Sequence, residues 1–175
     1  MLTIRPARLD DADTIGRLGV QVWQETYPGI VPQRHLDEMN VDIRSQRWRG
    51  LLSTQPADHF YGVAFDGSDL IGYAGGGPAR DDALKMPAVI YMINILKSGQ
   101  KRGVGRALMR YAAQSLIERG NTSAGLWVFV ENHNARAFYR HLGGIETDIR
   151  GSVDFDGDTR TDMAVHWPDI ATLAA

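Results

Sequence analysis

The chain has 175 residues, of which 43% are hydrophobic and 23% are charged, a composition typical of one water-soluble globular domain. Its formal net charge of -2 gives no reason to expect binding to nucleic acid or to an anionic membrane surface. The sequence has no cysteine, which excludes disulfides, thiolate metal sites and a cysteine nucleophile. We expect one domain over residues 1–175, a cytoplasmic location, and neither a secretory signal nor a membrane-spanning segment, because the apolar runs are too short.

The first third of the chain reads as a strand followed by two helical regions. Residues 2–7 alternate well enough for a strand. Apolar residues at helical spacing predict a helix over 11–26, which Pro28 and Gly29 end. A second helical region covers 33–53, with a break near Asn40.

The middle of the chain is predicted to be extended. Residues 59–65 and 70–75 read as two strands of a hairpin, joined at Asp66-Gly67. The stretch Gly75-Gly76-Gly77-Pro78 reads as a loop that leaves the second strand, because proline and no helix follow it. Residues 79–87 are polar and continue the loop. The apolar, β-branched run 88–96 predicts a central, buried strand.

The last part alternates between helices and strands. Residues 104–119 predict a helix capped by Gly120. A strand over 126–130 and a short helix over 135–141 follow. A final hairpin is expected from 145–153 and 161–167, turning at Asp156-Gly157.

The stretch from Gln100 to Leu108 joins a strand to a helix through a turn that contains Gly103 and Gly105. Such a junction presents free backbone N–H groups and the positive end of the helix dipole. Glycine lacks a Cβ atom, so an anion can approach the main chain closely. The turn is surrounded by basic residues, namely Lys97, Lys101, Arg102, Arg106 and Arg110. The pattern therefore predicts a ligand with several negative charges, most simply a phosphate or pyrophosphate.

Two nucleotide-binding motifs fail here on spacing. A Rossmann fingerprint requires glycine at position 108, where the chain has Leu108. A P-loop requires glycine at position 104 or 108, and position 104 is Val104. Binding of ATP or NAD through this turn is therefore disfavoured.

The pattern Gln-x-x-Gly-x-Gly at 100–105 instead resembles the acetyl-CoA signature of the GNAT superfamily of N-acetyltransferases. A second stretch, 132–143, has the form Asn-x-x-Ala-x-x-Phe-Tyr-x-x-Leu-Gly and resembles a later motif of the same family. Because two independent motifs occur in the family's order, the chain is identified as a member of its small bacterial type. Gly144 departs from the pattern, which usually has an aromatic residue there, so the packing after the 135–141 helix must differ.

Membership implies an α/β (α+β) domain with the GNAT fold. We expect a mixed, mostly antiparallel sheet of about seven strands with splayed central strands, flanked by about four helices. The resemblance also implies acetyl-CoA as the donor and coenzyme A as the product. It assigns to the cofactor the strand residues Ile93, Asn94 and Ile95, the turn residues Lys101, Arg102, Gly103, Val104, Gly105 and Arg106, and Asn132.

Tyr139 matches the tyrosine that acts as general acid toward the leaving thiolate in this family. A phenol with a pKa near 10 is a suitable proton donor for a thiolate whose pKa is ~8.5. The general base does not carry over, because the two central strands contain no carboxylate and Trp127 stands where some relatives have glutamate. Glu131, Glu25, a water chain, or an amine that arrives neutral remain as alternatives.

In the family, the first two helices and their connecting loop shape the acceptor pocket. The resemblance therefore makes Trp23, Glu25, Tyr27 and His35 substrate-side candidates, and it predicts as acceptor a primary amine of a small molecule or a protein. The alternative is a non-catalytic acyl-CoA-binding sensor that kept the turn and lost the base. Relatives are often dimers, so a homodimer is consistent with the resemblance.

Other site chemistries find no support in the sequence. The five histidines lack zinc-ligand spacing, and the segment 154–158 lacks the glycine and glutamate positions of an EF-hand loop. No Gly-x-Ser-x-Gly elbow accompanies the serines, so a hydrolase triad is not expected. We predict no metal site.

Overall fold

The computed structural model describes residues 1–174, which form one seven-stranded sheet in the order β1-β2-β3-β4-β5-β7-β6. All neighbouring strands are antiparallel except β4 and β5, which are parallel. The strands are β1 (Leu2–Pro6), β2 (Phe60–Asp66), β3 (Asp69–Pro78), β4 (Ala88–Ile95), β5 (Ala124–Phe129), β6 (Ile145–Phe155) and β7 (Asp158–Trp167). This is the mixed, mostly antiparallel sheet that the sequence predicts.

The described residues form six α-helices and two 3₁₀ turns: α1 (Ala12–Thr26), α2 (Gln33–Asp37), α3 (Val41–Thr54), α4 (Val104–Glu118), α5 (His133–His141), α6 (Ala171–Ala174), η1 (Leu9–Asp11) and η2 (Lys97–Gly99). The expected break near Asn40 is real, because the Asn40 side chain accepts a hydrogen bond from the Ile43 backbone N–H at 3.0 Å and caps α3. The expected helices over 11–26, 104–119 and 135–141 are present, the expected region 33–53 is divided into α2 and α3, and α6 is a short addition. No helix among residues 1–174 is long and apolar enough to cross a membrane.

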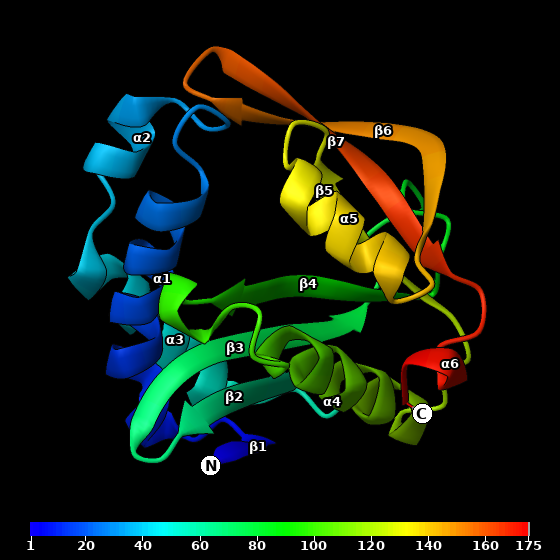
Figure 1. Ribbon diagram of the computed structural model, residues 1–175, viewed down its shortest axis with the longest axis horizontal. Coiled ribbons are helices and arrows are strands. Elements are labelled where there is room, and N and C mark those ends of the chain that lie inside the picture. Colours follow the sequence, from blue (N-terminus) through cyan, green and yellow to red (C-terminus); the bar gives the residue numbers. More distant parts are fainter. Residues whose placement is uncertain (175) are drawn as a thin grey trace.

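Helices cover both faces of the sheet (Figure 1). On one face α1 and α3 pack against the first half of the sheet through buried residues that include Ile15, Leu18, Trp48, Val63 and Tyr73. On the other face α4 and α5 share a core with the central strands, which includes Met109, Leu116, Leu126, Tyr139 and Trp167. The hydrophobic core is thus split by the sheet, and the two central strands contribute to both halves.

The glycine-rich stretch at 75–77 is not the loop that the sequence predicts. It is the last part of β3, which continues to Pro78. Aromatic side chains of the neighbouring strand lie across these glycines: a Cβ atom at Gly75 would be 2.7 Å from the Tyr61 ring, and one at Gly76 would be 2.6 Å from the Phe60 ring. The glycines therefore make room for close packing within a strand rather than for a turn.

Strand β4 contains a bulge at Tyr91. Across the β3–β4 ladder Gly75 pairs with Met92 and Gly76 pairs with Ile90, which leaves Tyr91 as an extra residue. A bulge bends the strand that carries it and changes which face the following side chains take. It comes just where β4 begins to separate from β5, and it is a local cause of the predicted splay.

The end of the chain packs on its own domain. Ile170 and Leu173 are buried in the same core as α4 and Trp167. The backbone N–H of Ile170 donates to the carbonyl of Thr122 at 3.0 Å. The tail therefore closes the α4 side of the molecule, near the C label in Figure 1.

Candidate functional site

The centre of the sheet contains an open edge. Strands β4 and β5 are paired only at Val89 and Gly125, after which they diverge (Figure 1). On its other side β4 is fully paired with β3, where Ala74, Tyr73 and Gly72 oppose Ile93, Asn94 and Ile95. Backbone groups alternate sides along a strand, so those of Ile93 and Ile95 face β5 and those of Asn94 face β3. The Ile95 carbonyl accepts a hydrogen bond from the Gln100 side chain at 3.3 Å, which leaves the Ile93 groups and the Ile95 N–H free to pair with an extended ligand.

The turn before α4 lies at the end of this open edge. Lys101 and Gly103 have left-handed backbone angles, with φ of 58° and 82°. Within residues 1–174 no backbone carbonyl accepts the N–H groups of Lys101 to Arg106, and the first helical bond runs from the Ala107 N–H to Gly103 at 3.0 Å. Successive free N–H groups with left-handed residues form a concave anion site, which the α4 dipole strengthens.

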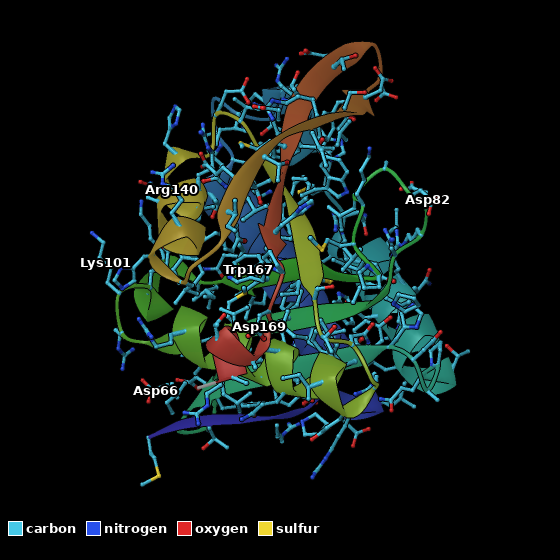
Figure 2. The ribbon with its side chains drawn as sticks, turned by 90° about the vertical axis from the view of Figure 1, so that its right-hand side faces the viewer. Asp66, Asp82, Lys101, Arg140, Trp167 and Asp169 are labelled. Atoms are coloured by element: carbon cyan, nitrogen blue, oxygen red, sulfur yellow. The ribbon has the colours of Figure 1, made fainter. Side chains whose placement is uncertain are left out.

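The basic side chains of the turn take different directions. Arg102 forms an ion pair with Asp66 of the β2–β3 hairpin and holds the pKa of that carboxyl below its usual value. Arg106 lies 3.3 Å from the His141 ring nitrogen on α5. Figure 2 shows Lys101 and Arg140 projecting on the same side of the molecule. The predicted turn residues are thus brought together, but the Arg102 guanidinium is already paired and only its backbone is available.

The second glycine of the turn also serves helix packing. A Cβ atom at Gly105 would lie 2.8 Å from Cζ of Phe138 on α5. The two helices that flank the open edge therefore meet at this point. Glycine at 105 therefore allows α4 to pack closely on α5, in addition to its predicted role of letting an anion approach the main chain.

Asn132 and Tyr139 both belong to the segment after β5. Asn132 is buried and caps α5, since its Oδ1 accepts a hydrogen bond from the Ala135 backbone N–H at 3.2 Å. Its side-chain amide N–H groups have no acceptor among the described residues. Tyr139 packs perpendicular to Trp167, with ring centres 6.0 Å apart. Its hydroxyl has no hydrogen-bond partner in the described chain and retains accessible surface.

The environment of Tyr139 keeps its phenol protonated. Burial raises the pKa of Tyr139 above its ordinary value, and the neighbouring phenol of Tyr27 raises it further. Tyr27 lies on the other face of β5, where its ring packs edge-on against Phe129 with ring centres 5.8 Å apart. A protonated phenol therefore lies within the influence of groups from both faces of the sheet.

An aromatic cluster lies on the α1 side of the sheet, formed by Trp23, Tyr27, His35, Phe129 and Phe155. The rings of Trp23 and Tyr27 are 4.7 Å apart, as are those of His35 and Phe155. Arg34 of α2 donates to the carbonyl of Phe155 at 2.6 Å, which fixes the β6–β7 hairpin against this helix. Three predicted substrate-side residues, Trp23, Tyr27 and His35, thus come together with rings from β5 and β6.

Strand β5 separates the aromatic cluster from Tyr139. Leu126 and Val128 pack in the core that contains Tyr139, whereas Trp127 and Phe129 point to the opposite face. A donor that lies along β4 between α4 and α5 and an acceptor held by the aromatic cluster would therefore meet at the gap between β4 and β5.

A model of the acetyltransferase (GNAT) family matches residues 20–143, which is more than half of the chain. The chain belongs to this family. As a GNAT protein it is an N-acetyltransferase of the EC 2.3.1 type.

Two GNAT relatives show the range of similarity. The uncharacterised N-acetyltransferase YuaI of Bacillus subtilis is 29% identical over 175 residues, which cover 99% of this chain and 96% of YuaI. The mycothiol acetyltransferase of Streptomyces scabiei is 28% identical over 123 residues, which cover 69% of this chain but 35% of that protein.

Solved structures confirm the GNAT fold. The PaiA N-acetyltransferase from Thermoplasma acidophilum, in complex with coenzyme A, superposes with a TM-score of 0.69 at 19% identity, covering 94% of this chain and 98% of PaiA. YncA from Salmonella typhimurium, with its cofactor acetyl-CoA, has a TM-score of 0.71 at 16% identity, covering 95% and 93%.

Of the two carboxylates that the sequence suggested as the general base, Glu25 is held by hydrogen bonds and Glu131 is exposed. Glu25 accepts hydrogen bonds from the side chain of Gln21 and from the backbone N–H of Lys97, both at 2.9 Å. It thus joins α1 to η2 just beyond β4, with both oxygens engaged. Glu131 is exposed at the turn after β5. The predicted role of Glu25 in substrate contact stays a prediction.

One carboxyl group near the aromatic cluster was missed by sequence reasoning. Asp162 of β7 lies directly opposite Phe129 of β5, and its Oδ1 is buried without a hydrogen-bond partner in the described residues. The signal available was the alternation of β7, in which Met163, Val165 and Trp167 form one core face. The residue between them and the turn, Asp162, must point to the other face.

Proposed function

We propose that this GNAT protein binds acetyl-CoA and transfers its acetyl group directly to a primary amine of a small molecule or a protein. The observation that supports this most is the unpaired edge of β4, which runs from the anion-binding turn toward Tyr139. Bound acetyl-CoA supplies an acetyl thioester, a carbonyl carbon already activated for attack by an amine. The chain's residues would hold the cofactor, polarise the thioester carbonyl and protonate the leaving sulfur.

Acetyl-CoA, the acetyl donor, would be bound mainly by backbone groups. The free N–H groups of Lys101 to Arg106 would bind the pyrophosphate, and Lys101 adds positive charge at the surface. The backbone groups of Ile93 and the N–H of Ile95 would pair with the extended arm of the cofactor, as an added strand pairs with a sheet edge. Asn94, which lies between them, turns its backbone groups toward β3. An N–H group of the same edge would polarise the thioester carbonyl. Asn132 has free amide N–H groups for a further contact.

The acceptor side uses the aromatic cluster. Trp23, Tyr27 and Phe129, whose rings pack on one another, would form an apolar wall beside the acceptor. The Tyr139 hydroxyl gives its proton to the departing sulfur, and its raised pKa ensures that the proton is present at neutral pH. These proposed roles require one shared location, the gap between β4 and β5.

Thermal unfolding with added ligands tests the donor. A ligand at about 100 times its Kd should raise the free energy of unfolding by ~2.7 kcal/mol. We expect stabilisation by acetyl-CoA and coenzyme A but not by ATP or NAD. Absence of any shift with either CoA species would overturn the proposal.

A panel of alkylamines, diamines and short peptides then tests transfer, with free thiol as the readout. The absence of a carboxylate from β4 and β5 favours a second candidate, a sensor that binds acyl-CoA without catalysis. The sensor would be stabilised by both CoA species and would release no thiol with any amine of the panel. Amine-dependent thiol release together with acetylated product would exclude it.

A further inference from the structure

We propose that Asp162 is the general base of this site, which receives the proton of the acceptor's ammonium group either directly or through one water molecule. The inference rests on the proposed function. Strands β4 and β5 contain no carboxylate that could act as the base. We assign that role to Asp162 instead of Glu25 or Glu131.

The position of Asp162 is set by the strands on both sides of it. It pairs with Phe129 of β5 and with Gly151 of β6, so its side chain lies on the same face as these two residues. Side chains directly opposite on neighbouring strands have Cβ atoms ~5 Å apart. Asp162 is therefore the cross-strand neighbour of Phe129, a member of the aromatic cluster.

Gly151 provides the space in which the carboxyl group lies. A Cβ atom at Gly151 would be 2.4 Å from Oδ1 of Asp162 and 3.3 Å from the Trp127 ring. The carboxyl thus fills a niche between β6 and the indole of Trp127. Its Oδ1 is shielded from water and has no hydrogen-bond partner in the described chain. A buried acceptor without a donor is unfavourable. The other carboxyl oxygen, Oδ2, keeps accessible surface, so it is the atom that an ammonium group or a water molecule could reach.

The charged groups around Asp162 are engaged elsewhere. Arg160, two residues along β7, pairs with Asp158 and donates to the carbonyl of Ile30 at 2.7 Å. Arg150 of β6 donates to the carbonyl of Thr147 at 2.7 Å. From β5 the side chains on this face are Trp127 and Phe129. The helices contribute the phenol of Tyr27, the imidazole of His35 and the guanidinium of Arg44, which lies 5.3 Å from the centre of the Trp23 ring.

These surroundings suit a proton acceptor. Burial raises the pKa of the Asp162 carboxyl, while the backbone N–H groups of Asp162 and Gly151 oppose the shift. A carboxylate with a raised pKa is a stronger base than an exposed aspartate. The same site would attract an ammonium group, because Asp162 has no cationic partner in the described residues.

The step balances with the groups already assigned. The ammonium group gives one proton to the Asp162 carboxylate and becomes a neutral amine. The amine nitrogen forms a bond to the acetyl carbonyl carbon, the bond from that carbon to sulfur breaks, and the sulfur takes a proton from Tyr139. The second proton of the nitrogen returns the Tyr139 phenolate to a phenol.

The test compares Asp162→Asn with Asp148→Asn, which changes an exposed aspartate of β6. For the best amine of the panel, kcat/KM is measured against pH for both variants and the wild type. We expect Asp162→Asn to lower kcat/KM by ~100-fold or more and to replace the wild-type decline on the acid side, which follows the carboxyl group, by one that follows the amine. Its remaining rate should rise with pH as the amine itself deprotonates. Asp148→Asn should match the wild type, and all three proteins should keep their stabilisation by acetyl-CoA.

A second variant distinguishes loss of the base from a folding defect. Asp162→Ala leaves a small space at the same position, and added formate, a free carboxylate, should restore part of the rate. A purely structural role would show no rescue.

The proposal is overturned if Asp162→Asn stays within threefold of the wild type, or if it raises KM alone with an unchanged pH profile. A wild type that binds acetyl-CoA but acetylates no amine would instead overturn the proposed function, and the base assignment with it.

Discussion

A Cβ atom on Gly144 would lie 2.7 Å from Cζ2 of Trp167 and 2.8 Å from Cγ1 of Val165. The Trp167 indole fills the space after α5, and its Nε1 donates to the carbonyl of Leu142 at 3.0 Å. The family usually has an aromatic residue at position 144. In this chain Trp167 of β7 occupies that space, and residue 144 is glycine. Trp167 also forms the wall behind Tyr139.

Gly144→Ala should lower the free energy of unfolding by ~1–3 kcal/mol, because the added methyl group overpacks a core with rigid neighbours. Urea unfolding measures the loss. The control is Gly50→Ala in α3, where no atom lies within 4 Å of the added Cβ. That change should be neutral or stabilise by up to ~1 kcal/mol, as expected for alanine in a helix. Equal effects at the two positions would contradict the packing argument.

Gly103→Ala should weaken acetyl-CoA binding. Gly103 and Gly29 have nearly equal φ values, 82° and 81°, and neither has a protein atom within 4 Å of the added Cβ. Both alanine variants should lose ~1–2 kcal/mol of stability through left-handed strain. Only Gly103 lies in the anion-binding turn, so only its variant should lose about tenfold in acetyl-CoA affinity, which is ~1.4 kcal/mol. Calorimetric titration of both variants checks this, and a similar loss with Gly29→Ala would count against the turn.

Tyr139→Phe should reduce turnover by ~10²–10⁴-fold, the usual contribution of a positioned general acid. The ring and its contact with Trp167 remain, so stabilisation by acetyl-CoA should be unchanged. Tyr111→Phe on α4 is the control and should leave turnover intact. Because burial raises the pKa of Tyr139, the wild-type rate should also show no decline from its ionisation below pH ~10. Full turnover in Tyr139→Phe would remove this residue from the mechanism.

Asp11 should make folding sensitive to acid. It accepts two hydrogen bonds from the Arg5 guanidinium, at 2.7 and 2.8 Å, and one from the Arg8 backbone N–H at 2.7 Å. The Arg5 hydrogen bonds hold the pKa of Asp11 below its usual value. A lowered pKa means that the stabilisation is complete above the unfolded pKa of ~3.9 and is lost as pH falls through the folded pKa.

Asp11→Asn should therefore cost about 2 kcal/mol at pH 7, and the difference from the wild type should shrink below pH ~4. Thermal unfolding across this pH range measures both quantities. Asp10→Asn, at the exposed neighbouring position, should unfold like the wild type at every pH. A loss for Asp11→Asn that does not vary with pH would show that charge is not the cause.

The sequence predicted the features that depend on local pattern. The helix after the turn, the break at Asn40 and the hairpin at Asp156-Gly157 follow from periodicity and turn chemistry. The glycines at 75–77 were misread, because their role depends on the rings of Tyr61 and Phe60 from another strand. Asp162 was missed for the same reason, since burial of a side chain at the far face of β7 is decided by β6 and the aromatic cluster.

The bulge at Tyr91 and the single β4–β5 pair leave the protein with a sheet edge in its interior rather than at its border. Unpaired strand edges invite other chains to pair with them, and border strands are usually protected by charge or cover. In this protein, protection would come from the cofactor, which occupies the edge as an extra strand. We therefore expect the ligand-free protein to self-associate more readily than the CoA-bound form, which links the cell's cofactor supply to the solubility of the enzyme.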